Sequence, residues 1–132
     1  MFPCLLQPVT LFPHALAVID GMLCQLTREG ARAAGYAPLA TAVVEFRHGP
    51  MRVYVREHPY GLLPGIPNLY CLDSNLRLQW LAEWPEHAGA CTRIAAHDND
   101  VLVGESATGA LVRIDTHSGR LLSVEPRLAE AS

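Results

Sequence analysis

The chain contains 132 residues, of which 50% are hydrophobic and 17% are charged, with a formal net charge of −3 and an isoelectric point of about 6.0. This hydrophobic content excludes a disordered chain, and the length suits one domain with its own core. Because there is no basic excess, we expect the protein to bind neither nucleic acid nor an anionic membrane surface. All ten basic residues are arginine, which excludes Schiff-base lysines and Walker A phosphate loops.

Residues 1–19 are apolar, but they match neither a signal peptide nor a membrane-spanning helix. The stretch has no basic start and no convincing cleavage site, and Pro3, Pro8 and Pro13 interrupt it. We therefore expect a cytoplasmic protein that does not enter the membrane.

The sequence shows no metal-binding or redox motif. Its four cysteines are too far apart for a zinc half-site or a CxxC pair, and each lies among apolar residues, so we expect reduced thiols in the core. The six histidines form no H-x-x-x-H or H-x-H pair. We therefore predict neither a metal nor a cofactor. The cysteines are Cys4, Cys24, Cys71 and Cys91.

Alternating apolar and polar residues, typical of half-buried strands, dominate the first half of the chain. Residues 5–11 are a weak strand candidate, whereas residues 15–20 and 22–26 are better ones. Residues 27–38 (TREGARAAGYAP) predict a short helix or an irregular loop. Further strands are expected at 41–46, 51–57 and 68–73.

Residues 76–84 (LRLQWLAEW) fit either a strand or a helix. Helical spacing leaves Leu78 and Ala82 outside the apolar stripe, whereas strand alternation places every second residue from Leu76 to Trp84 on one face, so we prefer a strand. Strands are also expected at 92–97, 100–106 and on both sides of the Ser118-Gly119 turn, where glycine allows a turn with a bulge.

Three segments of the chain align as an internal repeat. They are GMLCQLTREGARAAG, PNLYCLDSNLRLQW and TGALVRIDTHSGRLL, each with a strand, a turn and a basic residue. With the strands before them, they predict three units of four short antiparallel strands at about 5–39, 40–85 and 90–126, all within one domain. The aligned positions are Leu23, Leu69 and Leu111; Leu26, Leu72 and Ile114; and Thr27, Asp73 and Asp115.

These units resemble the repeats of the PQQ-like, or quinoprotein-type, β-propeller superfamily over about residues 50–125. Asp73 and Asp115 match the repeat aspartate, Ser118-Gly119 matches the turn, and Trp80 matches the closing tryptophan. Asn75 stands where glycine is usual, and the third unit lacks the tryptophan. No residue here matches the family's cofactor site, so the resemblance implies an architecture of propeller blades and no redox chemistry.

Several polar residues invite a catalytic interpretation, but turn chemistry explains them better. Ser106 in VLVGESATG precedes a strand rather than a helix, which contradicts a nucleophile elbow. His97, Asp98 and Asp100 could bind a metal or move protons, yet Asp-Asn-Asp between apolar runs is typical of a hairpin turn. Asp73 and Asp115 likewise favour turns, so we assign no catalytic residue.

The most unusual segment is the loop at residues 56–68 (REHPYGLLPGIPN). Its prolines reduce the entropy lost on ordering, and its apolar residues must cover the domain's own core or contact a partner. We treat it as a candidate surface for a protein partner or a ligand, together with two residues of the 96–102 stretch. The candidate residues are His58, Tyr60, Leu62, Leu63, Ile66, His97 and Asp98.

Two functional hypotheses follow from the sequence. In the first, three blades are too few for a ring, so two copies associate head to tail into six blades and act in recognition or as a scaffold, without catalysis. In the second, the chain is a compact β-barrel or sandwich that acts as a hydrolase-like enzyme or a small-ligand binder, with a pocket near residues 56–68 that contains His58, Tyr60, His97 and Asp98. A third possibility is that the chain is a piece of a longer propeller.

Overall fold

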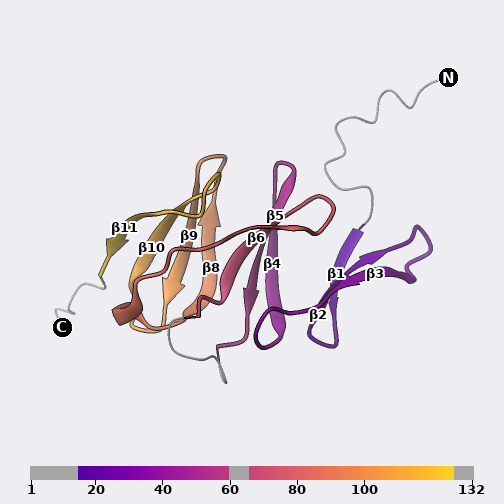
Figure 1. Cartoon of the computed structure of the whole chain (residues 1–132), viewed down its shortest axis with the longest axis horizontal. Helices are drawn as coiled ribbons and strands as arrows, with labels where there is room; N and C mark the ends of the chain where they lie inside the picture. The colour runs from indigo at the N-terminus through magenta and orange to yellow at the C-terminus, as the bar shows by residue number, and fades with distance from the viewer. Residues whose placement is uncertain (1–14, 60–65, 127–132) are drawn as a thin grey trace.

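The computed structural model describes residues 15–59 and 66–126, and strands make up most of this part of the chain (Figure 1). The described residues also contain one short 3-10 helix, η2 (Glu86–Ala88). The predicted all-β class is confirmed. The strands are β1 (Ala15–Ile19), β2 (Met22–Leu26), β3 (Arg32–Tyr36), β4 (Val43–Gly49), β5 (Arg52–Glu57), β6 (Leu69–Asp73), β7 (Leu78–Leu81), β8 (Cys91–His97), β9 (Val101–Ser106), β10 (Leu111–Asp115) and β11 (Leu121–Glu125).

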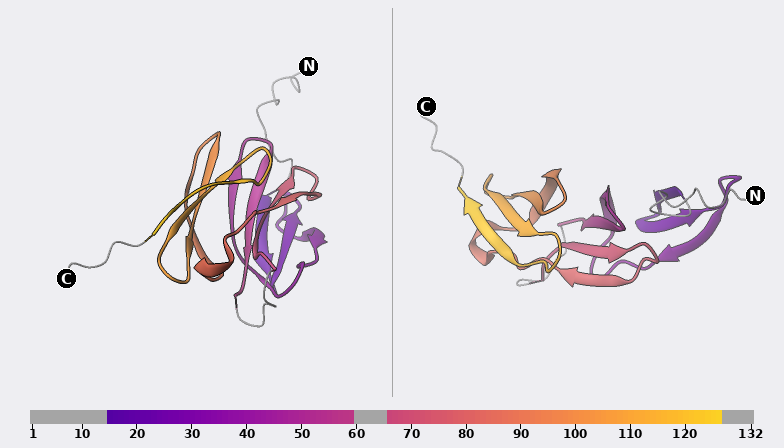
Figure 2. Two further views of the ribbon diagram at one scale, coloured as in Figure 1. Left: turned by 60° about the vertical axis from the view of Figure 1, so that its left-hand side comes forward. Right: turned by 90° about the horizontal axis from the view of Figure 1, so that it is seen from above.

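These strands form three antiparallel sheets in which each strand pairs with its neighbours in the chain. Their orders are β1-β2-β3, β4-β5-β6-β7 and β8-β9-β10-β11, and we call the sheets blades one, two and three. The blades lie side by side along an open arc, which is clearest from above in Figure 2. No sheet formed by the described strands closes into a barrel, so the predicted arrangement of separate blade-like meanders is confirmed.

Blade one corrects one prediction. Residues 27–38 are not a helix or an irregular loop, because they contain β3, which pairs with β2 from Leu23–Tyr36 to Leu26–Arg32. The alanines and glycines of this segment have little intrinsic preference for a strand, and pairing along β2 overrides that preference. The weak strand candidate at 5–11 lies outside the described residues.

Contacts between blades show which strand of blade one corresponds to which strand of the others. β1 contacts β4, the first strand of blade two, in the same way that β5 contacts β8, the first strand of blade three. β1 is therefore the counterpart of the second strands β5 and β9, and β3 is the counterpart of the outer strands β7 and β11. The first strands β4 and β8 also contact each other, as neighbouring inner strands of a propeller would.

A five-residue turn recurs three times in the arc. In each copy the backbone N–H of the first residue donates to the carbonyl of the fifth, and the N–H of the fifth donates to the side-chain oxygen of the first. Threonine, aspartate or serine can supply that oxygen, as is typical of turns. The turns run from Thr27 to Ala31, from Asp73 to Arg77 and from Ser106 to Ala110, so the predicted turn roles of Asp73 and Ser106 are confirmed.

The outer strand of every blade has a bulge at the same place. The register shifts between Gln25 and Leu26, between Cys71 and Leu72, and between Arg113 and Ile114. In blade two this shift changes the expected pattern: β7 is a strand as predicted, but Leu78 is 44% exposed instead of sharing a buried face with Trp80. A bulge inserts an unpaired residue, so strict alternation fails across it.

The apolar core lies between the blades. One cluster joins blades one and two, and a larger cluster joins blades two and three. Trp80 belongs to the larger cluster, and its indole N–H donates to the carbonyl of Thr116 at 3.0 Å. The predicted role of Trp80 as a packing anchor between blades is therefore confirmed. The buried members of the larger cluster are Tyr54, Leu69, Cys71, Trp80, Ala82, Cys91, Ile94, Leu102, Val112 and Ile114.

Candidate functional site

A shallow, largely open depression of about 260 Å³, which we call the cavity, lies where three turns of blades two and three meet. The β4–β5 turn, the β8–β9 turn and the β10–β11 turn form its walls. The β4–β5 and β8–β9 turns lie at the upper edge of the molecule in Figure 1. Connecting turns of this kind lie on the surface and often carry binding residues. The lining residues are Pro50, Arg52, Asn99, Asp100 and His117.

Buried Thr116 fixes the three walls of this cavity to one another. Its carbonyl accepts hydrogen bonds from the Arg52 guanidinium of blade two and from the Trp80 indole. Its hydroxyl donates to the carbonyl of Asn99 at 2.8 Å, and its backbone N–H donates to the carbonyl of Asp100 at 3.1 Å. Because hydrogen bonds to Thr116, partly or fully buried, hold the three walls together, the cavity is preorganised.

The cavity brings together charges of both signs. A guanidinium has five N–H donors, and in Arg52 one of them, on Nη1, donates to the carbonyl of Thr116. The Asp100 carboxylate lies 3.6 Å from Nε2 of His117. The exposed fractions of the Asp100 and His117 side chains are 83% and 61%, so this pair can rearrange around a ligand. The arrangement suits a small polar group and has no nucleophile placed next to a base.

Two of the sequence candidates, His97 and Asp98, lie at this same end of the blades. Asp98 is a turn residue: its carboxylate accepts the N–H groups of Asp100 and Val101, both at 2.8 Å, and these bonds lower its pKa. The half-buried His97 packs its ring against Tyr54, with the ring centroids 5.4 Å apart. The turn therefore explains the position of Asp98, and packing against Tyr54 explains the position of His97.

His58 lies at the opposite end of the blades, so the candidate residues do not converge. His58 follows the last residue of β5, whereas Tyr54, which contacts His97, lies nearer its start. At about 3.3 Å per residue, the length of β5 separates the two ends by roughly 17 Å. Ile66 lies in the same loop as His58 and is 43% exposed. The remaining candidates, Tyr60, Leu62 and Leu63, lie outside the described residues.

The end of the blades near His58 contains a buried carboxylate that the sequence interpretation did not single out. Glu57 is 1% exposed and accepts the backbone N–H groups of Leu39, Ala40 and Thr41 at 2.6, 2.9 and 2.9 Å. The hydroxyl of Tyr70 donates to the same carboxylate at 2.5 Å. Burial alone would raise the pKa of Glu57, but these four hydrogen bonds outweigh burial and lower it.

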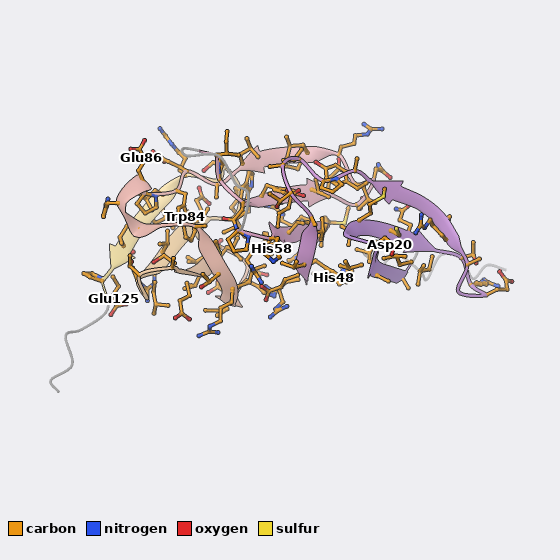
Figure 3. The ribbon with its side chains drawn as sticks, turned by 90° about the horizontal axis from the view of Figure 1, so that it is seen from below. Asp20, His48, His58, Trp84, Glu86 and Glu125 are labelled. Atoms are coloured by element: carbon orange, nitrogen blue, oxygen red, sulfur yellow. The ribbon has the colours of Figure 1, made fainter. Side chains whose placement is uncertain are left out.

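Glu57 therefore fixes the segment that connects blade one to blade two. Its neighbour in this network, Asn68, performs the same task between blades two and three. The amide of Asn68 donates to the carbonyl of Cys91 at 2.8 Å and accepts the N–H of Cys91 at 2.9 Å. Figure 3 looks onto this end and shows His58 between Asp20 of blade one and Trp84, which lies toward blade three. The geometry here is that of a structural clamp.

The sequence contained a signal for part of the cavity and none for the rest. Asp100 and His117 lie in predicted turns of the same blade, and alternate turns of an antiparallel meander lie at the same end of its sheet, so their approach could have been predicted from the order of strands. Arg52 had no such signal, because its hydrogen-bond partner Thr116 is 64 residues away. Glu57 and Asn68 looked like ordinary residues flanking a loop.

The described part of the chain contains no group of three or more His, Cys, Asp and Glu side chains that could hold a metal ion. Burial raises the pKa of both Cys71 and Cys91 to about 12, so both thiols are poor nucleophiles at neutral pH. Over the same described residues, no helix has the length and apolar character needed to cross a bilayer. No protein-family model matches the sequence, and no curated protein matches it significantly.

Proposed function

We propose that this protein is a non-catalytic recognition or scaffold protein, built from propeller-like blades, that assembles with copies of itself. The observation that supports this proposal is the open arc of three blades. Each internal boundary of the arc buries an apolar cluster between two blades, but no described blade follows blade three. Two copies joined head to tail would supply six blades and close a ring around a twofold axis.

Recognition in this proposal takes place at the turn face. The cavity between Arg52, Asp100 and His117 offers hydrogen-bond donors, a carboxylate and an imidazole, on walls that Thr116 holds in place. A volume of about 260 Å³ is below the range of most small-molecule pockets, so the cavity suits a very small polar molecule or one side chain of a protein partner. This cavity also favours small-ligand binding as a second candidate function, at the opposite end from the 56–68 loop. A protein contact through that loop stays a prediction.

The assembly is tested by measuring the molar mass of the full chain in solution from about one to a few hundred micromolar. We expect a mass of two chains, with dissociation at the lowest concentrations. A stable monomer over the whole range would contradict the proposal.

Ligand recognition is tested separately, by NMR with a panel of small polar molecules. We expect shift changes at the backbone amides of Asn99, Asp100 and His117, and expect them to disappear in Arg52→Ala if the guanidinium contacts the ligand. Changes confined to other surfaces would argue against this cavity.

A further inference from the structure

We propose that a second copy of this chain binds the face of blade three that points away from blade two, and that it does so through its own blade one. This inference rests on the proposed function and assigns the surfaces that would make the assembly.

We call the side of a blade that points toward the next blade its leading face, and the opposite side its trailing face. The leading face of blade two consists of Tyr54, Leu69, Cys71 and Trp80, and that of blade three of Val103, Leu111, Arg113 and Ser123.

Strand register establishes that these two leading faces are equivalent. In blade two a cross-strand row runs through paired residues on β5, β6 and β7, and in blade three a row runs through the matching positions of β9, β10 and β11. Both rows lie next to the bulge of the outer strand. The rows are Tyr54–Cys71–Trp80 and Val103–Arg113–Ser123.

An adjacent row on each blade contains an ion pair in the same place. In blade two, Nε of Arg56 lies 2.6 Å from the Glu45 carboxylate, and that carboxylate also accepts the N–H of Ile94 from blade three at 3.2 Å. In blade three the matching pair is Arg93 and Glu105, with Nε of Arg93 2.5 Å from the Glu105 carboxylate. Here the first strand carries the arginine and the second the glutamate, the reverse of blade two. An ion pair at this position is therefore compatible with a blade packed on top of it.

Exposure distinguishes the two leading faces. The side chains of Arg56 and Glu45 are 13% and 14% exposed beneath blade three, whereas those of Arg93 and Glu105 are 58% and 30% exposed. Leu69 is fully buried, and its counterpart Leu111 is only half-buried. The leading face of blade three thus has two apolar residues, Val103 and Leu111, and the ion pair of a blade interface, without a described blade to cover it. Arg113 lies at the centre of its row, where blade two has Cys71, and its guanidinium lies 3.1 Å from the Glu125 carboxylate.

The trailing face of blade one is the matching surface. Trailing faces of blades two and three pack on the blade before them. In blade one the corresponding row is made of small residues without charge, Ala17, Cys24 and Gly35, with Met22 beside it. Cys24 is fully buried and the Met22 side chain lies over Gly35. Ala17 and Met22 are therefore the residues of this face that Val103 and Leu111 of another copy would contact. An apolar, uncharged face also leaves the Arg93–Glu105 pair intact.

The test uses charge introduced on the leading face. Leu111→Glu and Val103→Glu should each weaken self-association by about a hundredfold or more, because each would bury an added carboxylate in the interface. Leu81→Glu is the matched control: Leu81 is also an exposed apolar strand residue, 45% exposed, but it lies on the outer strand of blade two away from the leading face of blade three. Leu81→Glu should associate like the wild type.

Two further measurements keep each outcome decisive. Thermal unfolding of every variant identifies one that fails to fold, and Leu111→Ala, which removes contact area without adding charge, should weaken association less than Leu111→Glu. Ala17→Glu, on the trailing face, should disrupt the dimer as strongly as Val103→Glu. If folded Val103→Glu is monomeric but folded Ala17→Glu is dimeric, two leading faces bind each other and the head-to-tail arrangement is wrong.

The two proposals fail in different ways. A monomeric wild type contradicts both the proposed assembly and this interface. A dimeric wild type whose folded Leu111→Glu and Val103→Glu variants remain dimeric leaves the assembly standing and overturns only the assignment of the leading face of blade three.

Discussion

The indole ring of Trp80 lies directly against Gly119, so that a Cβ atom placed on Gly119 would be 2.7 Å from the ring. Gly119 also has φ at 79°, a conformation that costs other L-residues about 1–2 kcal/mol. We therefore predict that Gly119→Ala lowers the free energy of unfolding by about 3 kcal/mol, from strain and overpacking together. Urea unfolding monitored by tryptophan fluorescence measures this loss.

Gly30→Ala is the matched control for that prediction. Gly30 has φ at 89°, but no atom lies within 4 Å of the Cβ that alanine would add. Its cost should therefore be the conformational strain alone, about 1 kcal/mol. Equal losses in Gly119→Ala and Gly30→Ala would show that contact with Trp80 contributes nothing.

Leu76 occupies the left-handed position of a turn in which the other two blades use glycine. Its φ is 61°, whereas Gly30 and Gly109 stand at 89° at the same position of the other two five-residue turns. Because Leu76 also packs against the core between blades one and two, its side chain offsets the strain. We predict that Leu76→Gly is more stable than Leu76→Ala by about 1 kcal/mol, the reverse of the usual order within strands.

Comparing these two variants isolates the backbone conformation, since both remove every leucine atom beyond Cβ. Chemical denaturation of the pair measures the difference directly. An alanine variant as stable as the glycine variant, or more so, would mean that the turn relaxes out of the left-handed region.

Local interactions explain how much of this structure the sequence predicts. The turn at Asp73 depends on hydrogen bonds to residues no more than four positions away, so its role followed from the sequence. The repeat likewise predicted the blades and the anchor Trp80. In contrast, Glu57 binds backbone groups 16 to 18 residues earlier, and Arg52 binds a carbonyl 64 residues later. Only the folded arc brings these partners together, so the place of Arg52 in the cavity and the clamp at Glu57 were not predictable.

Glu57→Gln tests the clamp between blades one and two. The Glu57 carboxylate accepts four hydrogen bonds, whereas a glutamine amide has one acceptor oxygen and would direct an NH₂ group at backbone donors. We expect a loss of about 3 kcal/mol in the free energy of unfolding, because buried donors lose their partners. Tyr70→Phe, which removes one of the four donors, should lose only about 1–2 kcal/mol. Similar losses in the two variants would contradict this account.

The same carboxylate makes stability depend on pH in a defined direction. The pKa of Glu57 is lowered on folding from an ordinary value of 4.5, so its ionised form stabilises the fold. That stabilisation is fully present above pH 4.5 and is lost as the pH falls through the lower pKa of the folded state. Asp98 and Asp115 also have lowered pKa values, so acid destabilises the wild type through several groups.

Comparison of the wild type with Glu57→Gln isolates the contribution of Glu57, since the variant keeps Asp98 and Asp115. A protonated Glu57 resembles glutamine, so we predict that the stability gap between the two proteins is constant from pH 7 to about pH 5 and closes as the pH falls further. Urea unfolding of both proteins at a series of pH values measures the gap. A gap that stays open down to pH 2 would mean that the carboxylate acts through its shape and not through its charge.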